Sequence, residues 1–234
     1  MNIWEIISVV SLVLLFVVYV QLQDIRSSIR QLILKEKKDS ADQEKEVIEF
    51  PEKSEVIIGA QVWMTKNLEV TTFRNGDPIP QAASDEAWAL AGKNKQPAWC
   101  YNGEHYGKLY NWYAVHDPRG LAPEGWHVPT DQEWTALEKA LGENPGKKMK
   151  STWGWHNKGN GTNSSGFSGL PAGGRAYGGK FYSIGEGAYW WSSTENDASH
   201  AWYRLLLNVN GGTGRVFRDD YVKELGLSVR CLRD

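Results

Sequence analysis

Eleven of the twelve tryptophans in this 234-residue chain lie between Trp63 and Trp202. Each aromatic side chain buries a large area, so this region is expected to fold around a dense aromatic core. The chain also contains 24 glycines, the residue that tight turns and close backbone approaches favour. Together these features predict one globular domain with an aromatic core and many turns.

Trp190 and Trp191 are neighbours in the segment AYWWSSTE, residues 188–195. Adjacent residues of a strand point to opposite faces, so at least one of the two rings must pack inward. Tyr189 shares a face with Trp191, and Ala188 shares a face with Trp190. A strand with bulk on both faces is usually covered on both sides. We therefore expect these tryptophans to belong to the core rather than to a sugar-stacking platform.

The clearest helix is predicted in PTDQEWTALEKALG, residues 129–142. Thr130 and Glu133 have the spacing of a capping box, and Gly142 ends the pattern. The apolar residues of one helical face are Trp134, Leu137 and Leu141. A second, short helix is expected between Ser84, a capping residue, and Gly92.

Strands are predicted on both sides of these helices. EVIIGAQVWM indicates two strands joined at Gly59–Ala60, and Asn75–Gly76 is typical of a hairpin turn. The C-terminal segments AYWWSST, AWYRLLLNV, GRVFRD and GLSVRCL have the spacing of an antiparallel meander. In the last of them, Leu225, Leu227, Val229 and Cys231 share one face, so Cys231 should point inward. The expected fold class is α+β.

Residues 1–23 are predicted to form a transmembrane helix, because residues 6–23 carry no charge. Extension back to residue 3 gives about 20 residues, the length that a bilayer core requires, so residues 3–22 are expected in the membrane. Residues 24–54 follow as a short amphipathic helix and a charged linker. A heptad-like seam suggests either self-association or a helix that is solvated or lies at the membrane surface; its residues are Leu22, Ile25, Ile29 and Leu32.

The charge balance argues against nucleic acid as a partner. The chain has 26 Lys and Arg against 28 Asp and Glu, with no basic stripe along the folded part. The two cysteines, Cys100 and Cys231, have no metal-ligand spacing, and the five histidines show no HxxxH or HExxH pattern. His127 is expected to pack or hydrogen-bond, and no cofactor is expected.

Several phrases occur together in one order: VWMTKNLEVTTFRNGDPIP, YGKLYNWYAVHDPRGLAPEGWHVPTDQEW, SGFSGLPAGGR, YWWSSTE and LSVRCLRD. They resemble the Fibrobacter succinogenes major paralogous domain over residues 56–234. The resemblance implies an α+β, C-type-lectin-like or formylglycine-generating-enzyme-like fold with short helices and long loops rich in Gly and Trp. It implies no defined reaction and no catalytic residues.

Binding residues are predicted beside the tryptophan pair. Glu195, Asn196 and Asp197 offer clustered oxygen atoms, which suit calcium, a direct ligand contact or a merely solvated loop. On the next strand, alternate residues share a face, and the face predicted to pack in the core contains Tyr203, Leu205 and Leu207. The opposite face, with Arg218 from the following strand, is expected to be the exposed recognition face; its residues are Trp202, Arg204 and Asn208.

We therefore expect a single-pass membrane protein whose domain binds carbohydrate or protein without catalysis. The alternatives are an oxidoreductase similar to the formylglycine-generating group, which would need Cys100 and Cys231 reduced in one pocket, and a structural envelope scaffold. We expect the two cysteines to form a disulfide if the domain is exported; free thiols would suit the cytoplasm.

The side of the membrane is left open by the sequence. The basic residues after the span favour a cytoplasmic domain by the positive-inside rule; they are Arg26, Arg30, Lys35, Lys37 and Lys38. The resemblance favours export, and long domains are translocated despite flanking charge. Of the two, export is slightly favoured.

Overall fold

The computed structural model describes residues 21, 26, 29–33, 35, 54–208 and 214–234. The chain divides into two compact units, residues 1–52 and 53–234. In the first unit, residues 29–33 are helical, and the side chains of Ile29 and Leu32 are exposed. Leu22 and Ile25 of the predicted seam lie outside the described residues. The predicted transmembrane helix also lies outside the described residues, apart from residue 21. Within the described part of the chain, no helix is long and apolar enough to cross a membrane.

The second unit is a mixed α+β domain with antiparallel sheets, as predicted. A four-stranded sheet has the order β1 (Glu55–Ile58), β2 (Gln61–Met64), β11 (Leu232–Arg233), β5 (Trp126–His127). A three-stranded sheet has the order β10 (Phe217–Val222), β9 (His200–Leu207), β8 (Gly187–Glu195). Two smaller pairs are β3 (Trp99–Tyr101) with β4 (Lys108–Tyr110), and β6 (Gly174–Arg175) with β7 (Phe181–Tyr182).

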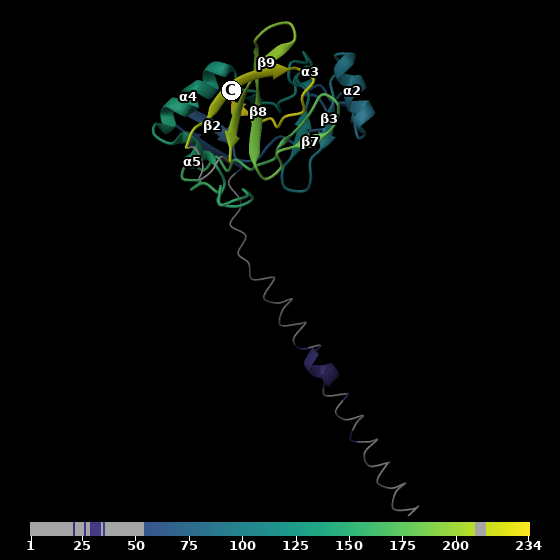
Figure 1. Ribbon diagram of the computed structural model, residues 1–234, viewed down its shortest axis with the longest axis vertical. Helices are drawn as coiled ribbons and strands as arrows, with labels where there is room; N and C mark the ends of the chain where they lie inside the picture. Colours follow the sequence, from purple (N-terminus) through teal and green to yellow (C-terminus); the bar gives the residue numbers. More distant parts are fainter. Residues whose placement is uncertain (1–20, 22–25, 27–28, 34, 36–53, 209–213) are drawn as a thin grey trace, which may run out of the picture. The chain divides into compact units, whose positions relative to one another are not determined.

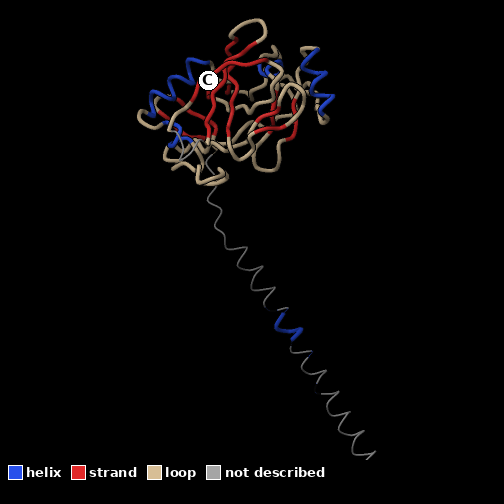
Figure 2. Tube along the Cα trace, in the orientation of Figure 1, coloured by secondary structure: helices blue, strands red, loops and turns tan. Residues whose placement is uncertain are grey.

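The helices lie on opposite sides of this domain. They are α2 (Asp85–Lys93), α3 (Trp112–Val115), α4 (Asp131–Leu141) and α5 (Pro145–Met149). Figure 1 shows α4 and α5 on one side and α2 on the other, with β8 and β9 between them. The predicted capping box of α4 is present, and Ser84 caps α2 by accepting the N–H of Ala87. Long loops fill the space around the strands (Figure 2).

The tryptophan pair is buried, as predicted, with 1% of Trp190 and none of Trp191 exposed. Trp190 packs in an aromatic cluster under α4, where its ring centroid lies 5.5 Å from that of Phe167 and 6.1 Å from that of Trp134. Trp191 packs in a second cluster, with Tyr203 at 6.1 Å. Strand β8 therefore separates two hydrophobic cores, one on each face.

The C-terminal segment departs from the predicted meander. Its first three strands form the expected antiparallel sheet, but residues 225–232 leave that sheet and run through the interior with every residue buried. The segment is held by bridges from Leu227 to Tyr110 and from Ser228 to Trp190 before it ends in β11. Cys231 points inward as predicted. A turn is present at Asn75–Gly76, but Gly76 N–H donates to Phe73 O, so Arg74 and Asn75 occupy its central positions instead of the predicted Asn75 and Gly76. One isolated bridge, between Thr72 and Pro78, accompanies it.

A buried cation holds the C-terminal segment in place. Arg230 is 1% exposed, and its guanidinium donates to Asn67 Oδ1 at 2.8 Å, to Met64 O at 3.1 Å and to Phe167 O at 2.5 Å. No carboxylate of the described residues pairs with it, so burial lowers the pKa of Arg230 to about 9. The group is still charged at neutral pH and depends on neutral oxygens and on the ring of Phe167.

Replacement of Arg230 is expected to lower the stability of the domain strongly. Arg230→Leu removes the guanidinium donor from Met64 O and Phe167 O and leaves Asn67 Oδ1 with only the indole N–H of Trp190, so the free energy of unfolding should fall by about 3–5 kcal/mol. Arg233→Leu, three positions along the same segment, removes a half-exposed ion pair with Glu55 and should cost less than about 1 kcal/mol. Denaturant unfolding followed by tryptophan fluorescence measures both, and equal losses would contradict this role of Arg230.

His127 links β5 to the C-terminus and to α4. Its Nδ1 lies 2.8 Å from Asp234 Oδ1 and its Nε2 lies 3.0 Å from Glu133 Oε1. Burial opposes the charged imidazolium, but these two carboxylates outweigh burial and raise the pKa of His127. The predicted hydrogen-bonding role is confirmed.

This raised pKa makes part of the stability depend on pH. The contribution should be complete below about pH 6.5, the pKa in the unfolded chain, and should be lost as the pH rises through the folded pKa. His127→Gln should therefore flatten the rise in urea midpoint on acidification from pH 8.5 to 6, whereas the exposed His105→Gln should not. An unchanged profile in His127→Gln would refute the assignment.

Candidate functional site

The predicted calcium residues do not converge on a common point. Glu195 forms an ion pair with Lys223, which also donates to Asp197 O at 2.8 Å. The Asp197 carboxylate accepts the backbone N–H groups of Ser199 at 2.7 Å and His200 at 2.8 Å, and these bonds hold its pKa well below the usual range. Within the described residues, no three His, Cys, Asp or Glu side chains are grouped to hold a metal. The exposed carboxylates instead order their own loop.

The prediction that Arg204 lies on an exposed recognition face is wrong, because α4 covers that face of the sheet. Only 1% of Arg204 is exposed; its guanidinium donates to Glu138 Oε1 and to Asp131 Oδ1, both at 2.6 Å. Leu206, on the same face, is fully buried. Strand alternation separates the two faces of β9, but it does not reveal which of them a helix covers.

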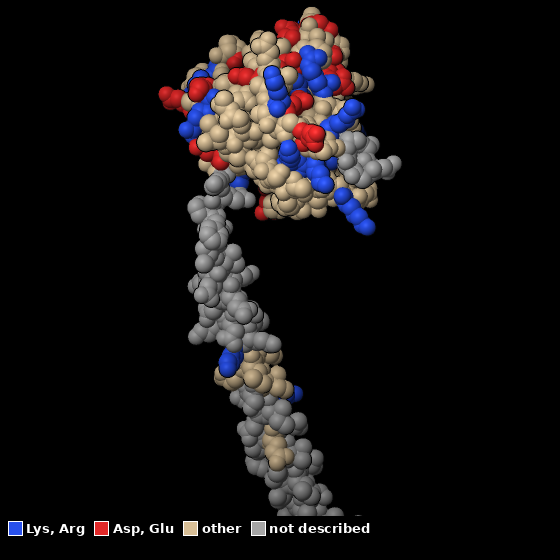
Figure 3. Space-filling model, turned by 90° about the vertical axis from the view of Figure 1, so that its left-hand side faces the viewer, with Lys and Arg blue, Asp and Glu red and all other residues tan. Residues whose placement is uncertain are grey.

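The other residues of this face are engaged within the protein. The Arg218 guanidinium lies 3.3 Å from the ring centroid of Trp202 and donates to Asp131 Oδ1 at 2.9 Å. Burial raises the pKa of Asp131, but the two arginines outweigh burial and lower it. Asn208 is apart from this group and donates to His156 O. The face is thus closed by an ion-pair network around Asp131, and acidic and basic side chains are interspersed on the α4 side of the domain (Figure 3).

The hollow lies on the other face of the same sheet. A pocket of about 370 Å³, here called the tyrosine pocket, opens where β8, β9 and β10 meet the β6–β7 hairpin. It is lined by Ala176, Tyr177, Tyr182, Tyr189, Tyr203, Leu205, Leu207, Tyr221 and Leu225. Residues that the alternation pattern assigned to the core therefore form the floor of a pocket.

The register of the sheet brings the tyrosines together. Tyr189 is paired with Leu205, and Tyr203 with Asp219, so Tyr189, Tyr203 and Tyr221 lie on one face of three adjacent strands. Tyr182 reaches the same place from β7, with its ring 5.5 Å from that of Tyr189. Tyr189 and Tyr203 form the floor at 9% and 8% exposure, whereas Tyr177 and Tyr221 are exposed.

The tyrosine hydroxyls act as neutral hydrogen-bonding groups. Burial raises the pKa of Tyr182 and of Tyr203 well above the usual value, and the neighbouring hydroxyls and Asp219 raise it further. The Tyr203 hydroxyl donates to Asp219 Oδ2 at 3.4 Å. These groups stay protonated at neutral pH, so they suit hydrogen bonding and ring stacking rather than proton abstraction.

The sequence contained a signal for this pocket. Tyr189 and Tyr203 occupy two consecutive predicted strands, and an antiparallel pair brings such residues to one face when the register allows it. Tyr221 follows the predicted strand GRVFRD, and the structure extends that strand to Val222. The register of β8, β9 and β10 and the approach of Tyr182 were not readable from periodicity, because both are contacts between different segments of the chain.

Residues 56–233 match the model of the Fibrobacter succinogenes major domain. The chain belongs to this family. The matched residues include the whole tyrosine pocket and all the predicted site residues of the C-terminal unit. A search of the curated proteins found no match.

The predicted disulfide is absent from this Fibrobacter succinogenes major domain: Cys100 and Cys231 are both free and buried. Cys100 packs in a small cluster with Trp88 and Leu109, whereas Cys231 belongs to the large core that contains Trp191. Burial raises the pKa of the Cys100 thiol and raises that of Cys231 to about 12. Because the two thiols pack in separate clusters, they do not form one pocket.

Thiol labelling tests this arrangement. In the folded domain neither cysteine should react with an aromatic disulfide reagent at pH 8, because both thiols are buried and protonated. After unfolding without reductant, two thiols per chain should react. A count of zero in the unfolded, unreduced protein would mean that the cysteines are paired.

Proposed function

We propose that this protein is a membrane-anchored, non-catalytic binding module that holds a carbohydrate in the tyrosine pocket. The observation that supports the proposal is the convergence of five tyrosine rings on one open hollow. Ligand sites are typically concave and mainly apolar, with a few polar groups that fix orientation, and this pocket has that character. A C-type-lectin-like arrangement, in which strands and long loops carry the site, belongs to the same proposal.

A carbohydrate matches both kinds of group in the pocket. The apolar face of a sugar ring stacks on an aromatic face, and ring contacts of this kind contribute about 0.5–1.5 kcal/mol each beyond area burial. The hydroxyls of Tyr182 and Tyr203 remain protonated. That of Tyr182 can donate to and accept from sugar hydroxyls, and that of Tyr203, which donates to Asp219, can accept from them. Leu205 and Leu207 complete the apolar wall.

The alternative of a formylglycine-generating oxidoreductase has less support. That chemistry requires two cysteines that act together, whereas Cys100 and Cys231 are buried in separate clusters. Neither cysteine lines the tyrosine pocket, and the tyrosines there have pKa values shifted away from neutrality. A scaffold role has no need of a pocket of this size.

Membrane anchoring through residues 3–22, with the domain exported, completes the proposal. The free cysteines by themselves would suit the cytoplasm, but both thiols are buried in separate clusters, so an exported domain can keep them unpaired. Its support is the uncharged run of residues 6–23, which has about the length of a bilayer core when extended to residue 3. An exported domain would meet carbohydrate at the cell envelope. Self-association through the seam from Leu22 to Leu32 would present several pockets together and raise avidity.

A glycan array with the full-length protein in detergent tests the carbohydrate proposal. Tyr177→Ala/Tyr221→Ala removes two exposed rings of the pocket mouth and should weaken glycan binding by roughly 5- to 100-fold, the loss of two ring contacts. Tyr101→Ala removes an equally exposed tyrosine on β3, outside the pocket, and should bind as the unmodified protein does. Absence of glycan binding, or equal binding by both variants, would refute the proposal.

A further inference from the structure

We infer that the saccharide held in the tyrosine pocket carries a protonated amino group, an inference that rests on the proposed carbohydrate function. Two features support it: tyrosine rings of the pocket that no Lys or Arg of the described residues covers, and one carboxylate held beside Tyr203, which lines the pocket. Ring stacking by itself does not distinguish a charged sugar from a neutral one, whereas these two features favour a charged sugar.

The first feature is the pattern of cation–ring contacts. In the described part of the chain, ten contacts place a Lys or Arg over an aromatic ring, and every ring is Trp or Phe. Arg218 over Trp202 and Arg175 over Trp88 are examples. The tyrosines of the pocket take part in none of them. The exposed rings of Tyr177 and Tyr221 can therefore receive a cation from a ligand, for which such contacts contribute about 0.5–2 kcal/mol.

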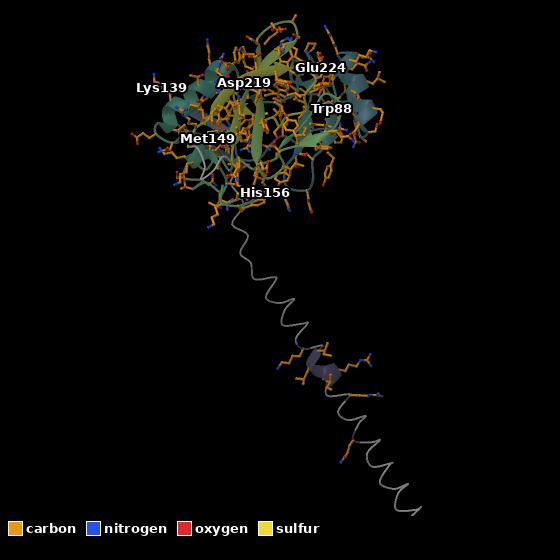
Figure 4. All side chains as sticks on the ribbon, in the orientation of Figure 1. Trp88, Lys139, Met149, His156, Asp219 and Glu224 are labelled. Carbon is orange, nitrogen blue, oxygen red and sulfur yellow. The ribbon has the colours of Figure 1, made fainter. Side chains whose placement is uncertain are left out.

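The second feature is Asp219, which stands on β10 opposite Tyr203. Its Oδ2 accepts the Tyr203 hydroxyl at 3.4 Å, and its Oδ1 accepts the backbone N–H of Asp220 at 3.0 Å. These bonds fix the carboxylate beside a residue that lines the pocket. Asp219 forms no ion pair with any Lys, Arg or His in the described part of the chain. Figure 4 shows Asp219 near the central strands and Glu224 with Trp88 toward α2, where Trp88 Nε1 donates to Glu224 O at 3.1 Å.

The charges around the pocket favour one sign of ligand. No lining residue is charged, and the nearest basic side chain along β10, Arg218, faces the opposite side of the sheet and binds Asp131. An acidic sugar would place its carboxylate beside Asp219, and none of the described residues that line the pocket carries a positive charge to compensate it. A neutral sugar would leave both Asp219 and the uncovered tyrosine faces without a charged partner. An ammonium group on the sugar ring satisfies both features at once.

Three tetrasaccharides with the same β-1,4 backbone test the inference: the glucosamine, N-acetylglucosamine and glucose forms. Titration calorimetry with the full-length protein in detergent should give about 10-fold tighter binding for the glucosamine form, equivalent to about 1.4 kcal/mol. Asp219→Asn should remove most of this preference, because the affinity for the glucosamine form should fall toward that for the two uncharged forms. The matched control is Asp220→Asn, because Asp220 lies on the same strand and points to the other face.

The outcomes separate the inference from the function on which it rests. Equal affinity for all three tetrasaccharides, with loss of binding in Tyr177→Ala/Tyr221→Ala, overturns the amino-sugar inference and leaves the carbohydrate function intact. A uniform loss for all three in Asp219→Asn overturns it also, because the residue would then serve only the fold. Binding of none of the three, together with an empty glycan array, overturns both.

Discussion

The buried guanidinium of Arg230 is the interaction on which most of this domain depends. It connects the C-terminal segment to the end of β2 through Met64 and to the long loop before β6 through Phe167. Asn67 supplies the central acceptor and also receives the indole N–H of Trp190 at 2.9 Å. A buried cation with no carboxylate partner tolerates little displacement of its neutral acceptors. Strand, loop and C-terminal segment are thereby held to one arrangement.

The aromatic load explains how so little regular secondary structure makes a stable domain. Trp190 and Trp191 send one ring to each side of β8, and each ring joins a different core. Their indole N–H groups bond to Asn67 Oδ1 and to Tyr110 O, so the large side chains are buried without loss of hydrogen bonding. Long loops can then be irregular, because aromatic contacts rather than backbone ladders hold them in place.

The three-stranded sheet has two faces with different roles. On one face, α4 covers Arg204, which pairs with Asp131 and Glu138, and Asp131 also pairs with Arg218. On the other, none of the described residues that line the tyrosine pocket belongs to a helix, and the β6–β7 hairpin borders the hollow. The proposed function follows from this asymmetry. On the α4 face the charged groups already pair with one another, whereas on the other face exposed aromatic rings can contact a ligand.

The sequence by itself determined the α+β class, the capped helix α4, the burial of the tryptophan pair and the inward direction of Cys231. Each follows from local chemistry or from the period of a strand, which a short segment contains in full. The family assignment was also readable from ordered phrases. Only the tertiary structure decided that Arg204 is buried, that Cys100 and Cys231 pack apart and that Tyr189, Tyr203 and Tyr221 line a pocket. These outcomes depend on which face α4 covers and on where residues 225–232 run. Such long-range contacts do not change the hydrophobic periodicity of the sequence, so periodicity cannot predict them.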